Sequence, residues 1–299
     1  RTLCDLVNAA RQRGYNVASR YRPEQGAHMT LRFLQAYFPS PGKIAGLLAL
    51  LSLLVGPVQS EEWIDLTYEL SPDAVFWPTA EPFKMRTDFE GYTEGGYYYS
   101  AYTFTTAEHG GTHIDAPIHF AEGKHTVDQV PLEKLIGDAV VLDLSKDVAD
   151  NCSYLVSISA IEAWEKRHGT ISEGAIVLLR TGFGKFWPDR KTYLGTDLRG
   201  EAGAAKLCFP GLAPEAATWL AETRKIHAVG IDTASIDRGQ SRDFAAHVNL
   251  MTNNIPAFEN LANLDKRPAT GAYVVALPIK IRGGSGGPLR IVARIPSSP

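Results

Sequence analysis

Short apolar runs constrain the fold of this chain more than any other feature. They occupy residues 139–144, 175–179, 227–232 and 273–277. Each run is shorter than a typical buried helix, and continuous apolar composition is typical of strands buried on both faces. Residues 159–167 and 214–223 have helical patterns, with Ser159 expected as the N-cap and Pro214 in the first turn. Strands alternating with helices predict an α/β fold with a layered, mixed β-sheet and flanking helices.

Additional β structure is expected beside this sheet. Residues 61–70 predict a short strand, and residues 97–106 alternate aromatic and β-branched side chains as strands do. A hydrophobic content of 44% and a charged content of 21% exclude a disordered chain. The formal net charge of −3 indicates no nucleic-acid partner. We expect one compact domain over residues 61–299.

Residues 1–60 are expected to lie outside that domain. The sequence begins with Arg1, so residues 1–28 are interpreted as upstream sequence, a longer isoform or a fragment, of unknown status. From Met29 onward, basic residues precede an apolar run at 44–55, and a modest and a small residue follow at Val58 and Ser60. That order is typical of a secretory signal peptide, here residues 29–60.

As a helix, the apolar run would span roughly 18 Å, short of the ~30 Å hydrocarbon core of a membrane. The alternatives are a buried core helix or an uncleaved anchor. With cleavage we expect a protein in the secretory lumen or outside the cell, without membrane attachment. Cys152 and Cys208 would then remain, and the sequence leaves open whether they form a disulfide.

The segment HGGTHIDAPIHF, residues 109–120, carries the candidate chemistry. His109 and His113 have the i, i+4 spacing of a zinc-protease helix, but Gly110 replaces the catalytic Glu of those enzymes, and the glycines disfavour a helix. As an extended segment, four side chains would share one face, since they all lie at odd positions: His109, His113, Asp115 and His119. Two imidazoles and a carboxylate are common ligands of Zn²⁺ or Mn²⁺, which leaves His119 for proton transfer. The alternative is a strand whose histidines only pack.

The same segment resembles the H-x-G-T-H-x-D-x-P-x-H signature of the cyclase-like metal-dependent hydrolases, which include bacterial-type kynurenine formamidase and isatin hydrolase. The resemblance extends over about residues 62–295 and includes segments at 77–78, 180–182, 209–211, 230–237, 255–261 and 283–290. It implies that His109, His113 and Asp115 bind a first metal and that His119 is the catalytic acid/base. It also implies a second site formed by His247 and Glu259, with Asp115 bridging the two sites. The expected cofactor is one or two Zn or Mn ions.

By the same resemblance, the chain is expected to be a metal-dependent hydrolase of a small aromatic amide in tryptophan catabolism. N-formylkynurenine is the leading substrate, with kynurenine and formate as products. The alternatives are a cyclic amide such as isatin, or a secreted protein that binds an aromatic ligand through the metal without turnover. We also expect a homo-oligomer, either a dimer or a tetramer.

Several residues outside the motif are open to more than one interpretation. Trp77 and Phe183 are candidates for the substrate pocket or for ordinary packing. Asp232 and Asp237 could bind a metal, but aspartates at strand ends more often bond to backbone. The glycine-rich residues 283–287 lack the ending of a phosphate loop, so we expect them to let the backbone pass close to another element.

Overall fold

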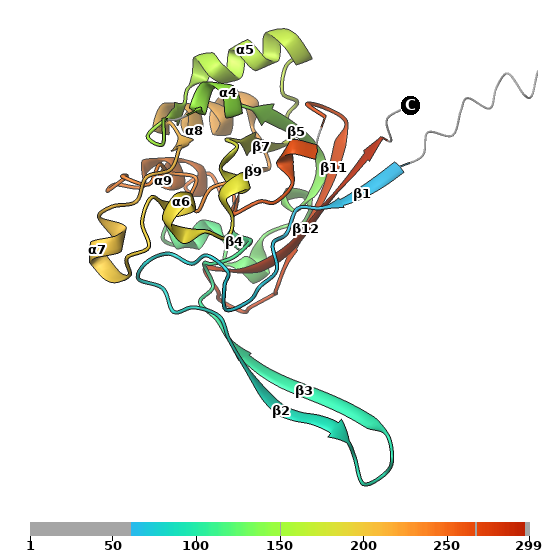
Figure 1. The fold of residues 1–299 in the computed structure, drawn as a ribbon. Helices are drawn as coiled ribbons and strands as arrows, with labels where there is room; N and C mark the ends of the chain where they lie inside the picture. Colours follow the sequence, from blue (N-terminus) through green and yellow to red (C-terminus); the bar gives the residue numbers. More distant parts are fainter. Residues whose placement is uncertain (1–60, 150, 267, 297–299) are drawn as a thin grey trace, which may run out of the picture. The chain divides into compact units, whose positions relative to one another are not determined.

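The structure is a computed structural model that describes residues 61–149, 151–266 and 268–296 (Figure 1). The predicted upstream segment and signal peptide, residues 1–60, lie outside the described residues. Within the described part of the chain, no helix is long and apolar enough to cross a membrane.

A mixed sheet of eight strands forms the centre of the domain. Their order in the sheet is β1 (Glu61–Asp65), β12 (Gly286–Pro296), β11 (Ala272–Pro278), β5 (Ile136–Asp143), β7 (Ile176–Arg180), β9 (Ala228–Ile231), β10 (Ala257–Glu259) and β4 (His113–Asp115). β5, β7, β9 and β10 pair in parallel, and the other pairs are antiparallel. All four apolar runs are therefore strands, and the predicted mixed α/β class is confirmed.

The sheet closes on itself, a feature that the sequence did not reveal. The beginning of β12 pairs with β4, with Gly286 opposite Asp115, so the strands form a barrel and β1 lies on its outside edge. A Cβ atom on Gly286 would lie 2.3 Å from the carbonyl oxygen of Ile114. Closure therefore depends on glycine at this position, as expected for a segment that passes close to another backbone.

Helices connect the parallel strands and cover the outside of the barrel (Figure 1). They are α4 (Ser145–Val148), α5 (Ile158–His168), α6 (Arg190–Leu194), α7 (Gly200–Ala204), α8 (Pro214–Trp219) and α9 (Ala245–Met251). Short 3-10 or π turns occur at Pro117–His119, Val127–Gln129, Leu132–Lys134, Phe183–Phe186, Leu220–Arg224 and Leu264–Lys266. The N-cap of α5 is Ser157 and not the predicted Ser159, because the Ser157 hydroxyl accepts the Ala160 N–H at 3.2 Å.

The two faces of β7 show why the apolar runs are continuous. Ile176 and Leu178 pack with residues from strands around the barrel, whereas Val177 and Leu179 pack with the helices. All four side chains are fully buried. A strand covered on both sides needs apolar residues at every position.

Two smaller β pairs lie outside the barrel. β6 (Leu155–Val156) pairs in parallel with β8 (Gly211–Leu212). β2 (Lys84–Tyr92) and β3 (Tyr98–Thr105) form a long hairpin that extends away from the barrel (Figure 1). β3 confirms the strand predicted at residues 97–106.

Cys152 and Cys208 form a disulfide, which answers the question that the sequence left open. Their Cα atoms are 5.3 Å apart, within the usual range for such a bond. The bond joins the segment between α4 and β6 to the segment that precedes β8.

Candidate metal centre

The antiparallel pairing of β4 with β10 brings one imidazole and two carboxylates of the site together. His113 lies directly opposite Glu259 in the antiparallel ladder, and Asp115 lies two residues further along β4, so all three share one face. On the other face, Ile114 and Phe258 are fully buried in the core of the barrel. Burial of these two apolar side chains fixes the strands, and with them the positions of His113, Asp115 and Glu259 on the opposite face.

The prediction of one extended face from His109 to His119 is correct only for the strand His113–Asp115. Before β4, Gly111 has a φ of +60°, and after it a 3-10 turn spans Pro117–His119. These turns still bring the two outer histidines to the site, since the rings of His109 and His119 stack at 3.8 Å. Local turns, and not the pleat of a strand, thus place both residues.

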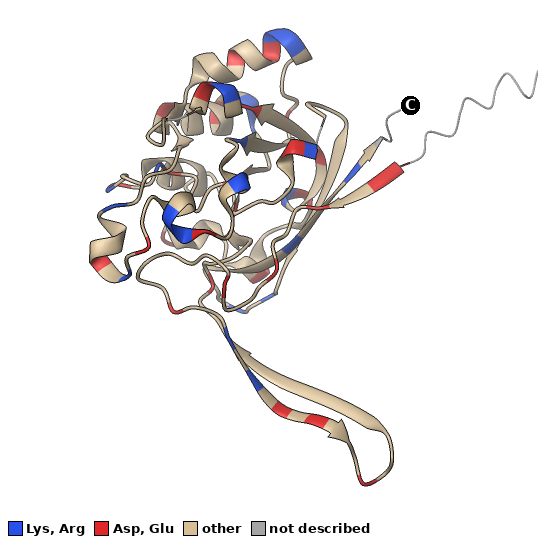
Figure 2. Cartoon of the chain, viewed as in Figure 1, with Lys and Arg blue, Asp and Glu red and all other residues tan. Residues whose placement is uncertain are grey.

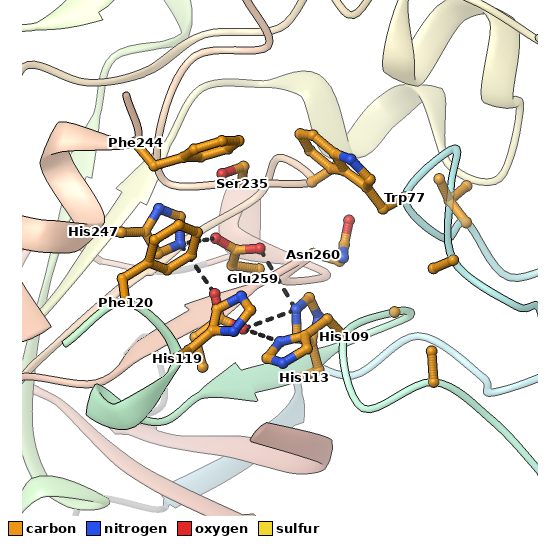
Figure 3. A pocket seen from close by; sticks show the side chains of 16 residues that line it. Trp77, His109, His113, His119, Phe120, Ser235, Phe244, His247, Glu259 and Asn260 are labelled. Carbon is orange, nitrogen blue, oxygen red and sulfur yellow. Dashed lines mark hydrogen bonds and ion pairs between the residues drawn. The ribbon is translucent and has the colours of Figure 1, made fainter. Parts of the chain in front are cut away.

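Asp115 belongs to both groups of possible metal ligands among the described residues. Figure 3 shows the other members of these groups, which are His109, His113, His247 and Glu259. The Oδ1 atom of Asp115 is 2.6 Å from His109 Nδ1 and 3.2 Å from His113 Nε2, and its Oδ2 is 3.0 Å from His247 Nε2. Glu259 completes the second group, with Oε1 at 3.1 Å from the same His247 nitrogen. The structure therefore brings together all five residues that the motif and the family resemblance assigned to a metal.

The electrostatics of this cluster fit divalent cations. Burial and the nearby charge of Asp115 raise the pKa of Glu259. Burial acts in the same direction on Asp115, but the neighbouring His109 and His113 hold its pKa well below the ordinary value. Among the described residues, the recorded ion pairs of both carboxylates are with histidines only. Two buried carboxylates that lack a Lys or Arg partner are a donor set that a bound cation would neutralise.

Hydrogen bonds outside the cluster orient its histidines. The Nδ1–H of His113 donates to the carbonyl oxygen of Gly111 at 2.9 Å. Because a carbonyl only accepts, this bond leaves the Nε2 lone pair free for a metal. His109 Nε2 lies 2.9 Å from the hydroxyl of Ser285, and that hydroxyl donates to Glu108 at 2.6 Å.

The two strand-end aspartates have different roles. Asp232 accepts backbone N–H bonds from Thr181 and Gly182, which is the backbone role expected for it. Asp237 instead accepts the Nδ1–H of His247 at 2.6 Å and also bonds to the backbone N–H groups that begin α9. It belongs to neither group of possible ligands and is more than a backbone partner, because it fixes the ring orientation of His247, a candidate ligand.

We expect Asp237→Asn to weaken metal binding about 10-fold, the lower end of the range for residues that support a ligand. An amide oxygen can still accept the His247 N–H, but it lacks the negative charge that makes the imidazole a stronger ligand. Chelator competition would give the dissociation constant. Asp243→Asn, in the exposed part of the same loop, is the matched control. Equal affinities in the two variants would contradict the role of Asp237.

A cavity of about 310 Å³ opens onto the metal residues. Its remaining walls are mostly apolar: Val75, Trp77, Ala80, Ala107, Phe120, Ala234 and Phe244, with Ser235 and Asn260. Trp77, Phe120 and Phe244 lie around the cavity in Figure 3. The prediction for Trp77 as a lining residue agrees with this geometry.

Phe183 does not line this cavity. The turn that follows β7 directs its ring into the core, where only 7% of the residue is exposed, and it borders a different cavity. Phe120 and Phe244 line the cavity but were not predicted from the sequence. The only signal for them was their closeness in sequence to His119 and His247.

Comparison of the sequence with known proteins identifies a family and several relatives. Residues 64–238 match a family described as putative cyclase. Isatin hydrolase of Roseibium aggregatum is 33% identical over 260 residues, covering 82% of this chain and 95% of that protein. Kynurenine formamidase of Bacillus thuringiensis is 31% identical over 239 residues, covering 79% and 99% respectively.

A solved structure, isatin hydrolase A from Labrenzia aggregata bound to benzyl benzoate, has a TM-score of 0.72 at 33% identity and covers 83% of this chain and 100% of that one. The fold, the donor cluster and these matches define a metal-dependent hydrolase. The chain belongs to the cyclase family.

Proposed function

We propose that this protein hydrolyses a neutral aromatic amide, with a cyclic amide of the isatin type as the best-supported substrate. The observation that carries this proposal is the composition of the cavity wall. Apart from the metal cluster and His119, no charged side chain of the described residues lines the cavity. Aromatic walls such as Trp77 and Phe244 suit an uncharged ring, whereas a charged group there would lose its hydration without a partner.

N-formylkynurenine is the second candidate. It is the substrate that the sequence resemblance favoured, and a relative at 31% identity is named kynurenine formamidase. This molecule carries an ammonium and a carboxylate beside its aryl formamide. The apolar wall offers these charges no partner, so they would have to remain in solvent at the mouth of the cavity. For that reason we place it after the neutral cyclic amide.

The proposed chemistry assigns separate tasks to the metal cluster and to His119. A divalent cation held by the cluster would lower the pKa of water toward ~7 and polarise the amide carbonyl. His119 is half-buried beside the cluster, and burial lowers its pKa to about 4. Its ring is therefore unprotonated at neutral pH and can accept a proton at a ring nitrogen. Once protonated, this ring is a stronger acid than an ordinary imidazolium, which favours return of the proton to the amide nitrogen as the C–N bond breaks.

Three substrates test the proposal on the metal-loaded protein. Isatin is neutral and cyclic, formanilide is neutral and open, and N-formylkynurenine is open and charged. We expect kcat/KM to fall in that order. If N-formylkynurenine is hydrolysed faster than formanilide, the cavity accepts the charged group and the second candidate is correct. If all three remain intact while an aromatic ligand binds, the non-catalytic alternative holds.

We also propose that the protein enters the secretory pathway. The support is the signal-like order of residues 29–60 together with the Cys152–Cys208 disulfide, since such bonds persist in oxidising compartments. Expressed from Met29 in a eukaryotic host, the protein should appear in the medium with Glu61 at its N-terminus. N-terminal sequencing checks this, and full-length protein in the cytosol would refute it.

A further inference from the structure

The segment between α4 and β6 contains an acceptor sequence for an N-linked glycan. Asn151, Cys152 and Ser153 follow the required pattern, which is asparagine, any residue except proline, and then serine or threonine. No other asparagine of the 299-residue chain has serine or threonine two positions later. We call these residues the sequon. Because such a pattern also arises by chance, its place in the fold decides whether it can carry a sugar.

The structure places Asn151 on the surface, in a turn. The residue is exposed, and its carbonyl oxygen accepts the backbone N–H of Tyr154 at 3.0 Å. Its side-chain Oδ1 accepts the backbone N–H of Ser153 at 3.1 Å, which is the geometry of an Asx turn. The other side-chain atom, Nδ2, makes no hydrogen bond with any described residue. The atom that would carry the glycan is therefore not needed for the fold.

The surroundings of the sequon suit a large polar group. The helices before and after it, α4 and α5, carry charged side chains of both signs, as solvated surfaces do (Figure 2). None of the residues of the sequon lines the metal cavity. In the view of Figure 1, α4 lies far from the β2–β3 hairpin. A glycan on Asn151 would therefore extend into solvent and leave the metal site open.

The disulfide at the centre of the sequon indicates when the glycan can be added. Cys152 bonds to Cys208, which is 56 residues later in the chain. At ~5–20 residues per second, synthesis of those 56 residues takes roughly 3–11 s. During that time the partner of Cys152 in the fold has not yet been made. Afterwards the bond holds the sequon against the domain, with Ser153 Oγ 4.0 Å from Cys208 Sγ. The sequon is therefore most accessible before the disulfide forms.

We propose that Asn151 is N-glycosylated in the secretory pathway before the Cys152–Cys208 disulfide forms. The inference rests on the proposed entry into that pathway. The donor is a lipid-linked oligosaccharide diphosphate, which the host cell supplies together with its transferase. Nδ2 of Asn151 forms a bond to C1 of the first sugar while the bond from C1 to the diphosphate oxygen breaks. The diphosphate leaves with its lipid, and Nδ2 gives up one proton to the transferase.

The order of the two modifications can be tested with a cysteine variant. Cys208→Ser removes the disulfide but keeps every residue of the sequon. If the glycan is added first, the glycosylated fraction of Cys208→Ser should equal or exceed that of the wild type. A lower fraction would mean that the transferase needs the closed disulfide, and it would overturn the proposed order.

Cell-free translation from Met29 with microsomes tests entry and glycosylation separately, and neither readout requires a folded variant. Protection from added protease reports entry, and a gel shift that peptide N-glycosidase reverses reports the glycan. We expect the wild type to be protected and shifted, and Asn151→Gln and Ser153→Ala to be protected but not shifted. Asn253→Gln, at an exposed asparagine outside the sequon, is the matched control and should keep the shift.

The outcomes distinguish this inference from the proposal on which it rests. Protected wild type without the shift would overturn glycosylation alone, whereas unprotected wild type would overturn secretory entry as well. A shift that persists in Asn151→Gln would place the sugar on another residue and would also overturn the assignment.

Discussion

Replacing Asp115 by asparagine should remove metal from both groups of ligands and lower kcat/KM by at least about 10³-fold. Each oxygen of its carboxylate contacts a different group, so one substitution affects both. Asparagine has nearly the same shape but no charge, and one of its two positions becomes an NH₂ that cannot bind a cation. Metal catalysis contributes several kcal/mol to the lowering of the barrier, which at ~1.36 kcal/mol per tenfold gives this range.

Metal analysis and kinetics on the same preparation would check this prediction. Asp138→Asn is the control, because it makes the same chemical change at an exposed position on β5. Melting temperature should fall in Asp115→Asn but not in the control, since a metal held by these residues would link β4, β10 and α9 in the folded state. Full metal content in Asp115→Asn would show that the carboxylate is not a shared ligand.

Local sequence patterns carried most of the information about this protein. The apolar run at residues 175–179 predicted β7 because a strand covered on both faces has no polar position. The spacing of His113 and Asp115 predicted ligands on one face because the period of a strand is two residues. His247 and Glu259 came from the family resemblance, since nothing near them in sequence indicated that they lie beside Asp115.

The features that the sequence did not predict depend on contacts between distant segments. Closure of the barrel requires Gly286 to pair with Asp115 of β4, which is distant in the sequence. No local sequence pattern indicates that pairing. Asp237 orients His247 because the loop before α9 brings its carboxylate against the first turn of that helix. The turns at Gly111 and at Pro117–His119 replaced the extended geometry, as the glycine and proline in the motif allow.

His119→Ala should separate proton transfer from metal binding. His119 belongs to neither group of ligands, so we expect the variant to keep its metal and its fold. Loss of a general acid/base typically costs 10²–10⁴ in rate, and we expect kcat/KM to fall by at least ~10²-fold. His125→Ala, the next histidine along the chain and absent from the cavity wall, is the control. Loss of metal in His119→Ala would make this residue a ligand, and near-normal turnover would remove it from the mechanism.

The dependence of kcat/KM on pH gives a second test of the role of His119. Because burial lowers the pKa of His119 to about 4, its ring stays unprotonated as the pH falls from 7 to 5, and kcat/KM should be lost only near pH 4. An unperturbed histidine would instead lose activity near pH 6.5. Acid also protonates ligand histidines, so metal content must be measured at every pH. A fall in kcat/KM near pH 6.5 with the metal still bound would mean that the catalytic base is exposed to water, and that the aromatic wall formed by Phe120 and Phe244 does not shield it.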